Sequence, residues 1–363
     1  MFNDFFEHSR NLLGVLLKDW RRYRRALTGQ GASYLSLRNR DELLEAGPDG
    51  KGYRCDWQWT SDLHAPKFLP ALGLRLMERA LDDHPIRRAA APEGKSQQPA
   101  ISFVIGHRGF DRLPHLLATL ESIAGQRDVS FECVVVEQSV SPEVRDHLPA
   151  WIRYIHTPLP YADMPYVRAW AFNIGAHVAR AEVLVLHDND MLVPVDYAKE
   201  VFERFRDGYQ VMNLKRFIFY LSEAHSAALF SGKESLAQRP PQVVVQNLEA
   251  GGSVAITRKA YDQIGGMDES FIGWGSEDNE FWERAQTLKI WPFGYLPIVH
   301  LWHAPQSGKF NTDRSTTKLY EERSAIPVID RIVELTARDF GNPRSCLVVR
   351  RPSSVVRHQS CAE

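Results

Sequence analysis

Cysteine is scarce in this sequence. The 363 residues include four cysteines, at positions 55, 133, 346 and 361, and no metal-ligand spacing separates them. This distribution argues against a disulfide framework or a zinc site and suits a reducing compartment. No apolar run approaches the ~18 residues of a membrane span, and the N-terminus lacks a signal-peptide pattern. We therefore expect a cytoplasmic protein.

The sequence also lacks a charge excess and two common nucleotide-binding motifs. Its formal net charge is −1, which gives no global argument for nucleic acid as a partner. A Gly-x-Gly-x-x-Gly turn and a Walker loop are both missing, so the dinucleotide and P-loop interpretations fail. The composition, 44% hydrophobic and 25% charged, is that of a soluble globular protein. The length admits one large α/β domain with an appendage, or two ordinary domains.

The first hundred residues predict a helical and irregular extension. Residues 2–27 have the spacing of one amphipathic helix whose second half is basic and carries Trp20 and Tyr23. Such a helix can lie on an anionic membrane surface, or it can dock on its own domain with a solvated basic face. Residues 28–60 are expected to be irregular, 69–81 helical and 87–98 a linker. Residues 55–59 form either a packing cluster or part of an acceptor site.

The central part alternates buried strands with amphipathic helices. A strand, a helix and a second strand at 100–105, 113–124 and 131–136 form a βαβ unit, which implies a parallel sheet. Further strands are predicted at 151–156, 183–186, 210–220 and 251–256, further helices at 167–180 and 196–206, and a polar, mobile loop at 222–242. The fold class is therefore α/β.

Two carboxylates follow the most apolar strand. Val183 to Leu186 lead through His187 into Asp188-Asn189-Asp190. An acidic pair at the carboxyl end of a buried strand lies where open α/β sheets bind ligands. Hard oxygen ligands there suit Mg²⁺ or Mn²⁺. The alternative is an acidic turn without a ligand.

A second acidic group follows a flexible aromatic segment. Gly273-Trp274-Gly275 precedes Ser276, which is predicted to cap a helix with Glu277 and Asp278 in its first turn. Acids there complement the helix dipole. The Gly-Trp-Gly segment instead favours an indole placed against a ligand ring, with the carboxylates beside it.

Three smaller features complete the candidate chemistry. The pair Gly251-Gly252 leads into a strand, either as a bulge or as a close approach to a ligand. A later strand ends in His300-Leu301-Trp302-His303, and two histidines three residues apart can share a metal or be structural. Arg108, in the turn after the first strand, is a candidate for contact with a phosphate.

Taken together, residues 100–314 resemble the inverting glycosyltransferases of the GT-A fold. They are most similar to the β-1,4-galactosyltransferase group and related bacterial family 2 enzymes. Four motifs occur in the family's order: Tyr166-Val167-Arg168-Ala169 with Asn173-Ile174-Gly175, then Asp188-Asn189-Asp190, then Gly251-Gly252 with Gly273-Trp274-Gly275-Ser276-Glu277-Asp278, and finally His300-x-x-His303. The resemblance implies a Rossmann-like, mostly parallel sheet flanked by helices.

The resemblance also implies a role for each matching residue. It makes Asp278 the general base and leaves Glu277 to acceptor binding or support. It places the metal, Mn²⁺ or Mg²⁺, on Asp190, His300 and His303. The expected donor-binding residues are Tyr166, Arg168, Asp188, Asn189, Gly252 and Trp274, together with Arg108 from its place in the turn after the first strand. Two departures stand out, because Asn279 replaces the family's third acid and Ile105-Gly106-His107-Arg108-Gly109 replaces its Pro-Phe-Arg-x-Arg.

We therefore expect an inverting, metal-dependent glycosyltransferase that moves a sugar from a nucleotide-sugar to a hydroxyl group. The donor is expected to be a UDP-sugar of galactose or N-acetylhexosamine type, and the acceptor a glycan or a lipid-linked molecule. The alternatives are an inactive carbohydrate- or nucleotide-sugar-binding protein and a metal-dependent nucleotidyltransferase. The expected domains are an extension at 1–98, a catalytic domain at 99–340 and a flexible tail at 341–363. Residues 1–27 would contact the inner face of the membrane.

Overall fold

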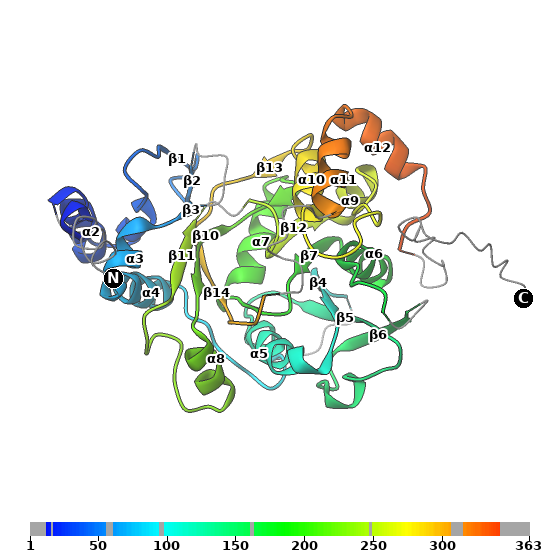
Figure 1. Ribbon diagram of the computed structural model, residues 1–363, viewed down its shortest axis with the longest axis horizontal. Helices are drawn as coiled ribbons and strands as arrows, with labels where there is room; N and C mark the ends of the chain where they lie inside the picture. The colour runs from blue at the N-terminus through cyan, green and yellow to red at the C-terminus, as the bar shows by residue number, and fades with distance from the viewer. Residues whose placement is uncertain are drawn as a thin grey trace, which may run out of the picture.

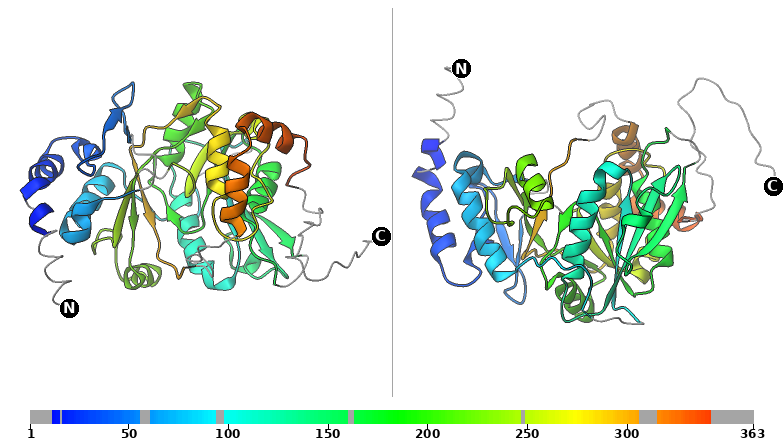
Figure 2. Two further views of the ribbon diagram at one scale, coloured as in Figure 1. Left: turned by 45° about the horizontal axis from the view of Figure 1, so that its top comes forward. Right: turned by 90° about the horizontal axis from the view of Figure 1, so that it is seen from below.

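The computed structural model describes residues 12–15, 17–55, 61–93, 98–159, 163–246, 249–305 and 315–341. The predictions for residues 2–11, 56–60 and 342–363 therefore lie outside the described residues. Two large sheets lie side by side, with the N-terminal helices at one end of the molecule and the last helices at the other (Figures 1 and 2).

The larger sheet has seven strands in the order β13-β9-β12-β7-β4-β5-β6. Its strands β4, β5, β6 and β7 are parallel, and β12 runs antiparallel to β7. The bounds are β4 Ile101–His107, β5 Phe131–Ser139, β6 Arg153–Pro158, β7 Val183–His187, β9 Val211–Met212, β12 Ser253–Thr257 and β13 Ile290–Trp291. The predicted βαβ unit and parallel sheet are confirmed.

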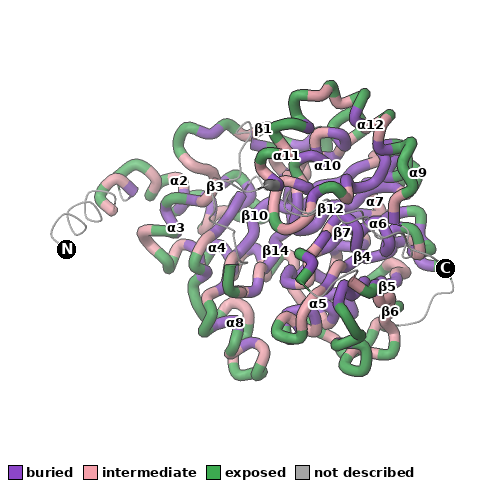
Figure 3. The backbone as a smooth tube through the Cα atoms, turned by 45° about the vertical axis from the view of Figure 1, so that its right-hand side comes forward, coloured by how far each residue is buried: buried purple, intermediate pink, exposed green. Residues whose placement is uncertain are grey.

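Alternate residues of the central strands enter two hydrophobic cores, which explains their continuous apolar runs. Phe103 and Val185 belong to the core that includes residues of α5 (Leu113–Ala124) and α7 (Tyr197–Arg206). Val104 and Leu184 belong to the core that includes residues of α6 (Arg168–Val178), α9 (Arg258–Gln263) and α10 (Glu277–Ala285). These strands form the buried centre of the tube in Figure 3.

The smaller sheet has five strands in the order β3-β11-β10-β14-β8. Its bounds are β3 Ser61–Asp62, β8 Met191–Leu192, β10 Lys215–Tyr220, β11 Val243–Gln246 and β14 Leu296–His300. The predicted single strand at 210–220 is wrong, because β9 belongs to the seven-stranded sheet and β10 to this one. The chain passes between the sheets at Asn213 and Leu214.

Three local predictions also need correction. Residues 222–242 contain the helix α8 (Glu223–Phe230), whose first turn is capped by Ser222 Oγ accepting from the His225 backbone N–H at 3.2 Å. Residues 28–60 contain the short helix η1 (Ser33–Ser36) and an antiparallel hairpin of β1 (Leu44–Ala46) and β2 (Tyr53–Cys55). Ser276 does not cap α10 with its side chain, because its backbone is left-handed at φ 72° rather than extended.

The remaining elements are helices near the two ends of the described chain and two short 3-10 helices in the central part. They are α2 (Trp20–Thr28), α3 (His64–Phe68), α4 (Pro70–Asp83), η2 (Phe110–Arg112), η3 (Arg145–His147), α11 (Ser315–Ser324) and α12 (Val328–Thr336). Buried side chains of α2, η1 and α4 belong to the same core as those of β4 and β10. Among the described helices, none is long and apolar enough to cross a bilayer.

Candidate active site

The turn after β7 brings Asp190 against the end of β14. Asp190 is followed by β8, and β8 pairs antiparallel with β14, with Met191 opposite His300. The Leu301 backbone N–H donates to the Asp190 carbonyl oxygen at 2.9 Å. Strand pairing therefore fixes the distance between the acidic turn and the histidine segment, which the sequence separates by more than a hundred residues.

Asp190, His300 and His303 form a group that could hold a metal ion, since one ligand atom from each lies within 4.8 Å of the others. His300 Nε2 lies 3.8 Å from Asp190 Oδ1, and His303 Nε2 lies 3.4 Å from Asp190 Oδ2. His303 Nδ1 lies 2.7 Å from the Ala304 carbonyl oxygen, so it carries the proton and leaves Nε2 as an electron-pair donor. One carboxylate and two imidazoles fit a divalent transition metal.

The electrostatics around Asp190 keep its carboxylate ionised. Burial alone would raise its pKa, but His300, the Arg112 guanidinium and His303 more than offset that effect and lower the pKa to about 2. Arg112 donates to Asp190 Oδ2 at 2.5 Å. The His300 ring stacks on Tyr220 with ring centroids 4.2 Å apart, and burial lowers the pKa of His300. The lowered pKa favours the neutral, ligating form of the His300 imidazole.

Arg168 connects the two acidic motifs. Its guanidinium donates to Asp188 Oδ1 at 2.8 Å and to Glu277 Oε1 at 3.3 Å, and it lies over the Phe172 ring. Arg168 is the first residue of α6, where the seven-stranded sheet and α10 meet. The predicted donor-binding arginine therefore holds two carboxylates in this structure.

Asp188 and Asp278 lie on either side of the glycine pair. The Asp188 backbone N–H donates to the Gly252 carbonyl oxygen at 2.8 Å. A Cβ atom on Gly251 would lie 2.3 Å from Asp278 Oδ2, and Gly251 has φ +70°. Glycine is required here because a side chain would both strain the backbone and displace the acid. The predicted close approach was to a ligand, and the neighbour that the structure shows at Gly251 is Asp278.

Glu277 and Asp278 differ sharply in their surroundings. Glu277 is 7% exposed, and burial together with the Asp278 charge raises its pKa to about 7 despite Arg168. Its Oε2 is buried without a hydrogen-bond partner in the described structure. Asp278 is half-buried, and its Oδ1 accepts from the Asn279 backbone N–H at 2.9 Å.

The remaining predicted residues surround this cluster. Trp274 is 39% exposed between Gly273 at φ 95° and Gly275 at φ 108°. Tyr166 lies against Gly106, where a Cβ would meet its hydroxyl at 2.1 Å, and its carbonyl accepts from the Gly273 N–H. Arg108 is half-buried, and burial lowers its pKa.

Two members of the α6 motif have structural roles. Asn173 is fully buried and clamps the Met267 backbone through both atoms of its amide. A Cβ on Gly175 would come within 2.2 Å of Val104, so glycine allows α6 to pack closely on β4.

The structure adds three residues that the sequence did not single out for the site. His107 is fully buried, its Nδ1 accepts from the Asn189 amide at 2.8 Å, and burial lowers its pKa to about 4. Lys215 donates to the Ser253 carbonyl at 2.5 Å, and burial lowers its pKa to about 7. Arg112 is the third. No local motif includes any of them, because the hydrogen-bond partner of each is distant in the sequence.

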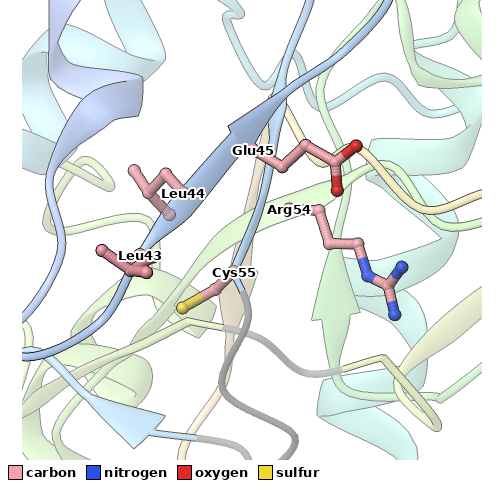
Figure 4. Close-up of a pocket in the computed structure, with 5 residues that line it drawn as sticks. All are labelled: Leu43, Leu44, Glu45, Arg54 and Cys55. Atoms are coloured by element: carbon pink, nitrogen blue, oxygen red, sulfur yellow. The ribbon is translucent and has the colours of Figure 1, made fainter.

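A separate hollow of about 350 Å³ lies against the β1–β2 hairpin (Figure 4). It is lined by Leu43, Leu44, Glu45, Arg54 and Cys55, of which only Cys55 belongs to the segment at 55–59 that was predicted as a packing cluster or part of an acceptor site. Arg54 pairs with Glu249 at 3.6 Å, and Glu249 accepts from the Trp282 indole at 3.1 Å. The hairpin is thereby linked to α10.

Comparison with known proteins agrees with the motif analysis. Residues 246–294 match the family model described as the N-terminal domain of galactosyltransferase. The segment includes Gly251, Trp274 and Asp278, and the match confirms the predicted resemblance to a glycosyltransferase enzyme. No curated protein sequence matches the chain.

Two solved structures are similar to the chain. The crystal structure of GalNAc-T7 with UDP, GalNAc and Mn²⁺ is 15% identical with a TM-score of 0.44, over 66% of this chain and 53% of that one. The catalytic domain of Drosophila beta1,4galactosyltransferase 7 in complex with xylobiose is 16% identical with a TM-score of 0.37, over 63% of this chain and 82% of that one. This chain thus spans about half of the GalNAc-T7 chain.

Proposed function

We propose that this protein is an inverting, metal-dependent glycosyltransferase of GT-A type that uses a UDP-sugar of galactose or N-acetylhexosamine type. One observation carries the proposal. The possible metal group of Asp190, His300 and His303 includes an acid that is close to Asp188 in the sequence, and the Gly251–Gly252 turn contacts both Asp188 and Asp278. The galactosyltransferase match over residues 246–294 supports the same reaction class. The acceptor would be a hydroxyl group of a glycan or of a lipid-linked molecule.

Asp190, His300 and His303 would hold the divalent cation, expected to be Mn²⁺ or Mg²⁺. Such a cation neutralises the charge that develops on a departing diphosphate. Imidazole ligands favour Mn²⁺ over Ca²⁺. The stacking of His300 on Tyr220 and the His303–Ala304 hydrogen bond hold the two rings in place before any cation arrives.

Asp278 is the proposed general base. It would take the proton of the acceptor hydroxyl as that oxygen bonds to the anomeric carbon and the bond to the UDP oxygen breaks, which inverts the configuration. The half-buried position of Asp278 leaves it open to an acceptor, whereas Glu277 is buried against Arg168. Arg168 would keep Asp188 and Glu277 oriented, and the exposed Trp274 indole would line the floor shared by donor and acceptor.

The decisive experiment measures UDP release from a panel of UDP-sugars, with and without candidate acceptors and with Mn²⁺ or EDTA. Acceptor-dependent release that chelation abolishes and Mn²⁺ restores supports the proposal. Binding of a UDP-sugar without any turnover would indicate an inactive binding protein. Formation of diphosphate from a nucleoside triphosphate and a sugar phosphate would indicate a nucleotidyltransferase.

The N-terminal helix is the proposed contact with a membrane. Val15, Tyr23 and Ala26 are buried against the protein, whereas Leu13, Leu17 and Trp20 are 58%, 81% and 47% exposed. The exposed side also carries Lys18, Arg21, Arg24 and Arg25. An apolar stripe beside a cationic one matches an anionic lipid surface. We place the protein in the cytoplasm, at the inner face of the membrane, near a lipid-linked acceptor.

A further inference from the structure

We infer that Arg112 is a displaceable counter-ion of Asp190. In this inference, which rests on the proposed function, its guanidinium neutralises the carboxylate until a divalent cation binds and then turns to the donor diphosphate. Arg112 would thus be a donor-binding residue outside the family-like motifs.

The contact between Arg112 and Asp190 is short and sheltered. The guanidinium donates to Asp190 Oδ2 at 2.5 Å and to Asn189 Oδ1 at 3.4 Å. The side chains of Arg112 and Asp190 are 18% and 8% exposed. Arg112 lies in the connection between β4 and α5, just after Gly109 at φ 85°. It therefore reaches the acidic turn from the edge of the sheet where a nucleotide would bind.

A cation in the proposed metal site would compete with this contact. His303 Nε2 is 3.4 Å from the same Asp190 Oδ2 that accepts from Arg112. A cation held between Asp190 and His303 would approach the electron pairs that the guanidinium now occupies. Two positive groups on a single sheltered carboxylate repel one another strongly where water is scarce.

The charge balance indicates where Arg112 would go. When both histidines bind a cation as neutral ligands, Asp190 contributes one negative charge. The cation contributes two positive charges and the guanidinium contributes one. The diphosphate of a UDP-sugar supplies two negative charges, which brings this set to neutrality. A planar guanidinium also pairs well with phosphate oxygens. Cation and donor would therefore bind cooperatively, with Arg112 moving between two anions.

This arrangement predicts opposite effects of one substitution. Arg112→Met keeps much of the side-chain volume and removes the charge, so the cation no longer has to displace a guanidinium. We expect Mn²⁺ affinity without nucleotide to increase by about tenfold, the worth of a charge-assisted hydrogen bond. UDP affinity at saturating Mn²⁺ should fall by about tenfold for the same reason. A purely structural arginine would weaken both.

The experiment titrates the full chain with Mn²⁺ by electron paramagnetic resonance, and with UDP by calorimetry at saturating Mn²⁺. Arg180→Met is the matched control. Arg180 pairs with Glu132 at 2.7 Å, and neither residue belongs to the metal group. Arg112→Lys keeps the charge and should resemble the wild-type protein in Mn²⁺ affinity. Circular dichroism establishes that each variant is folded before titration.

The outcomes separate this inference from the proposed function. If wild-type protein binds Mn²⁺ and Arg112→Met leaves its affinity unchanged or weaker, Arg112 is not a displaceable counter-ion, and the metal site stands. If UDP affinity at saturating Mn²⁺ is unchanged in Arg112→Met, the inferred contact between Arg112 and the donor diphosphate is wrong. If the wild-type protein binds no Mn²⁺ with or without UDP, the inference and the metal-dependent function both fail.

Discussion

At the scale of single residues, the backbone places the neighbouring acids Glu277 and Asp278 in different surroundings. Glu277 points into the protein against Arg168, and Asp278 lies beside Gly251. Successive residues of a helix point about 100° apart, so in the proposed mechanism only one of the two would face the anomeric carbon. The left-handed Ser276 and the positive-φ glycines before it set the orientation in which the helix begins.

Replacing Asp278 by Asn should abolish most transfer while leaving binding intact. The substitution keeps the shape and removes the proton acceptor, so the rate should fall by ~10²- to 10⁴-fold. Affinities for UDP and Mn²⁺ should stay within about twofold, because Asp278 is outside the metal group. The transfer assay measures the rate, and calorimetry measures the affinity for UDP. Asn279→Ala, at the exposed next position, is the control.

A near wild-type rate for Asp278→Asn would move the base to Glu277. Its pKa of about 7, raised by burial and by Asp278, would suit that role.

Glu277 should also make stability depend on pH. Its pKa rises from 4.5 in the unfolded chain to about 7 in the folded protein, so the folded state binds more protons between those values. Its contribution is fully present below about pH 4.5 and is lost as the pH rises through 7. Urea unfolding at pH 5 and pH 8 should therefore show wild-type protein losing more stability than Glu277→Gln.

The control for this comparison is Glu321→Gln, which removes an exposed carboxylate on α11. It should keep the wild-type difference between the two pH values. If Glu277→Gln keeps that difference as well, the buried carboxylate is not the titrating group.

The residues of the site were partly predictable from sequence. Asp188 and Asp190 belong to a local motif whose position at a strand end follows from periodicity, and Trp274 and Asp278 belong to a local motif at the start of a helix. Arg112 and His107 carry no such signal, because their partners Asp190 and Asn189 are about eighty positions away. Only the pairing of β4 with β7 brings them together.

At the scale of elements, buried strands and long amphipathic helices were predicted well, and α5 has the predicted bounds. The failures have a common physical origin. A strand that changes sheets, as between β9 and β10, has the same apolar pattern as one that does not. Likewise, the apolar residues of α8 do not gather on one helical face, so no helical periodicity stands out. The helix is stabilised by its Ser222 cap and by Ser226 Oγ, which accepts from Trp302 N–H at 2.8 Å.

The N-terminal helix should bind anionic vesicles through its exposed stripe. Replacing Leu13, Leu17 and Trp20 together by Gln removes the apolar contacts and should abolish co-sedimentation of the full chain. Each Lys or Arg near an anionic surface contributes roughly 1 kcal/mol, so added salt should also weaken binding by the wild-type protein. Neutral vesicles should bind much less of it.

The matched control for the helix uses α12. Ile329 and Val333 are 58% and 63% exposed there, and replacing both by Gln lowers surface hydrophobicity elsewhere. This variant should sediment with the vesicles like the wild-type protein. Equal, negligible binding by the wild-type protein and the helix variant would make the helix a docked structural element only.

At the scale of the whole molecule, the N-terminal region and the catalytic sheets share one core. Arg216, 3% exposed at the start of β10, donates to the Leu35 and Leu37 carbonyl oxygens of the N-terminal region. It also donates to Gln246 at 3.1 Å, and β3 pairs with β11 beside it. The predicted linker at 87–98 therefore does not make the N-terminal region an independent unit, because strand pairing and the buried Arg216 guanidinium connect that region to the catalytic sheets.

Replacing Arg216 by Met should accordingly destabilise the entire protein. The change leaves buried carbonyl oxygens at Leu35 and Leu37 without donors, at a cost of about 1–3 kcal/mol each. Calorimetric heating should show one unfolding transition for wild type and variant, with the variant's transition at a lower temperature. Arg75→Met, which removes a 74% exposed guanidinium from α4, should leave the transition in place. Two separate transitions, with only the smaller one shifted by Arg216→Met, would mean that the N-terminal region unfolds on its own and that the shared core does not couple it to the catalytic sheets.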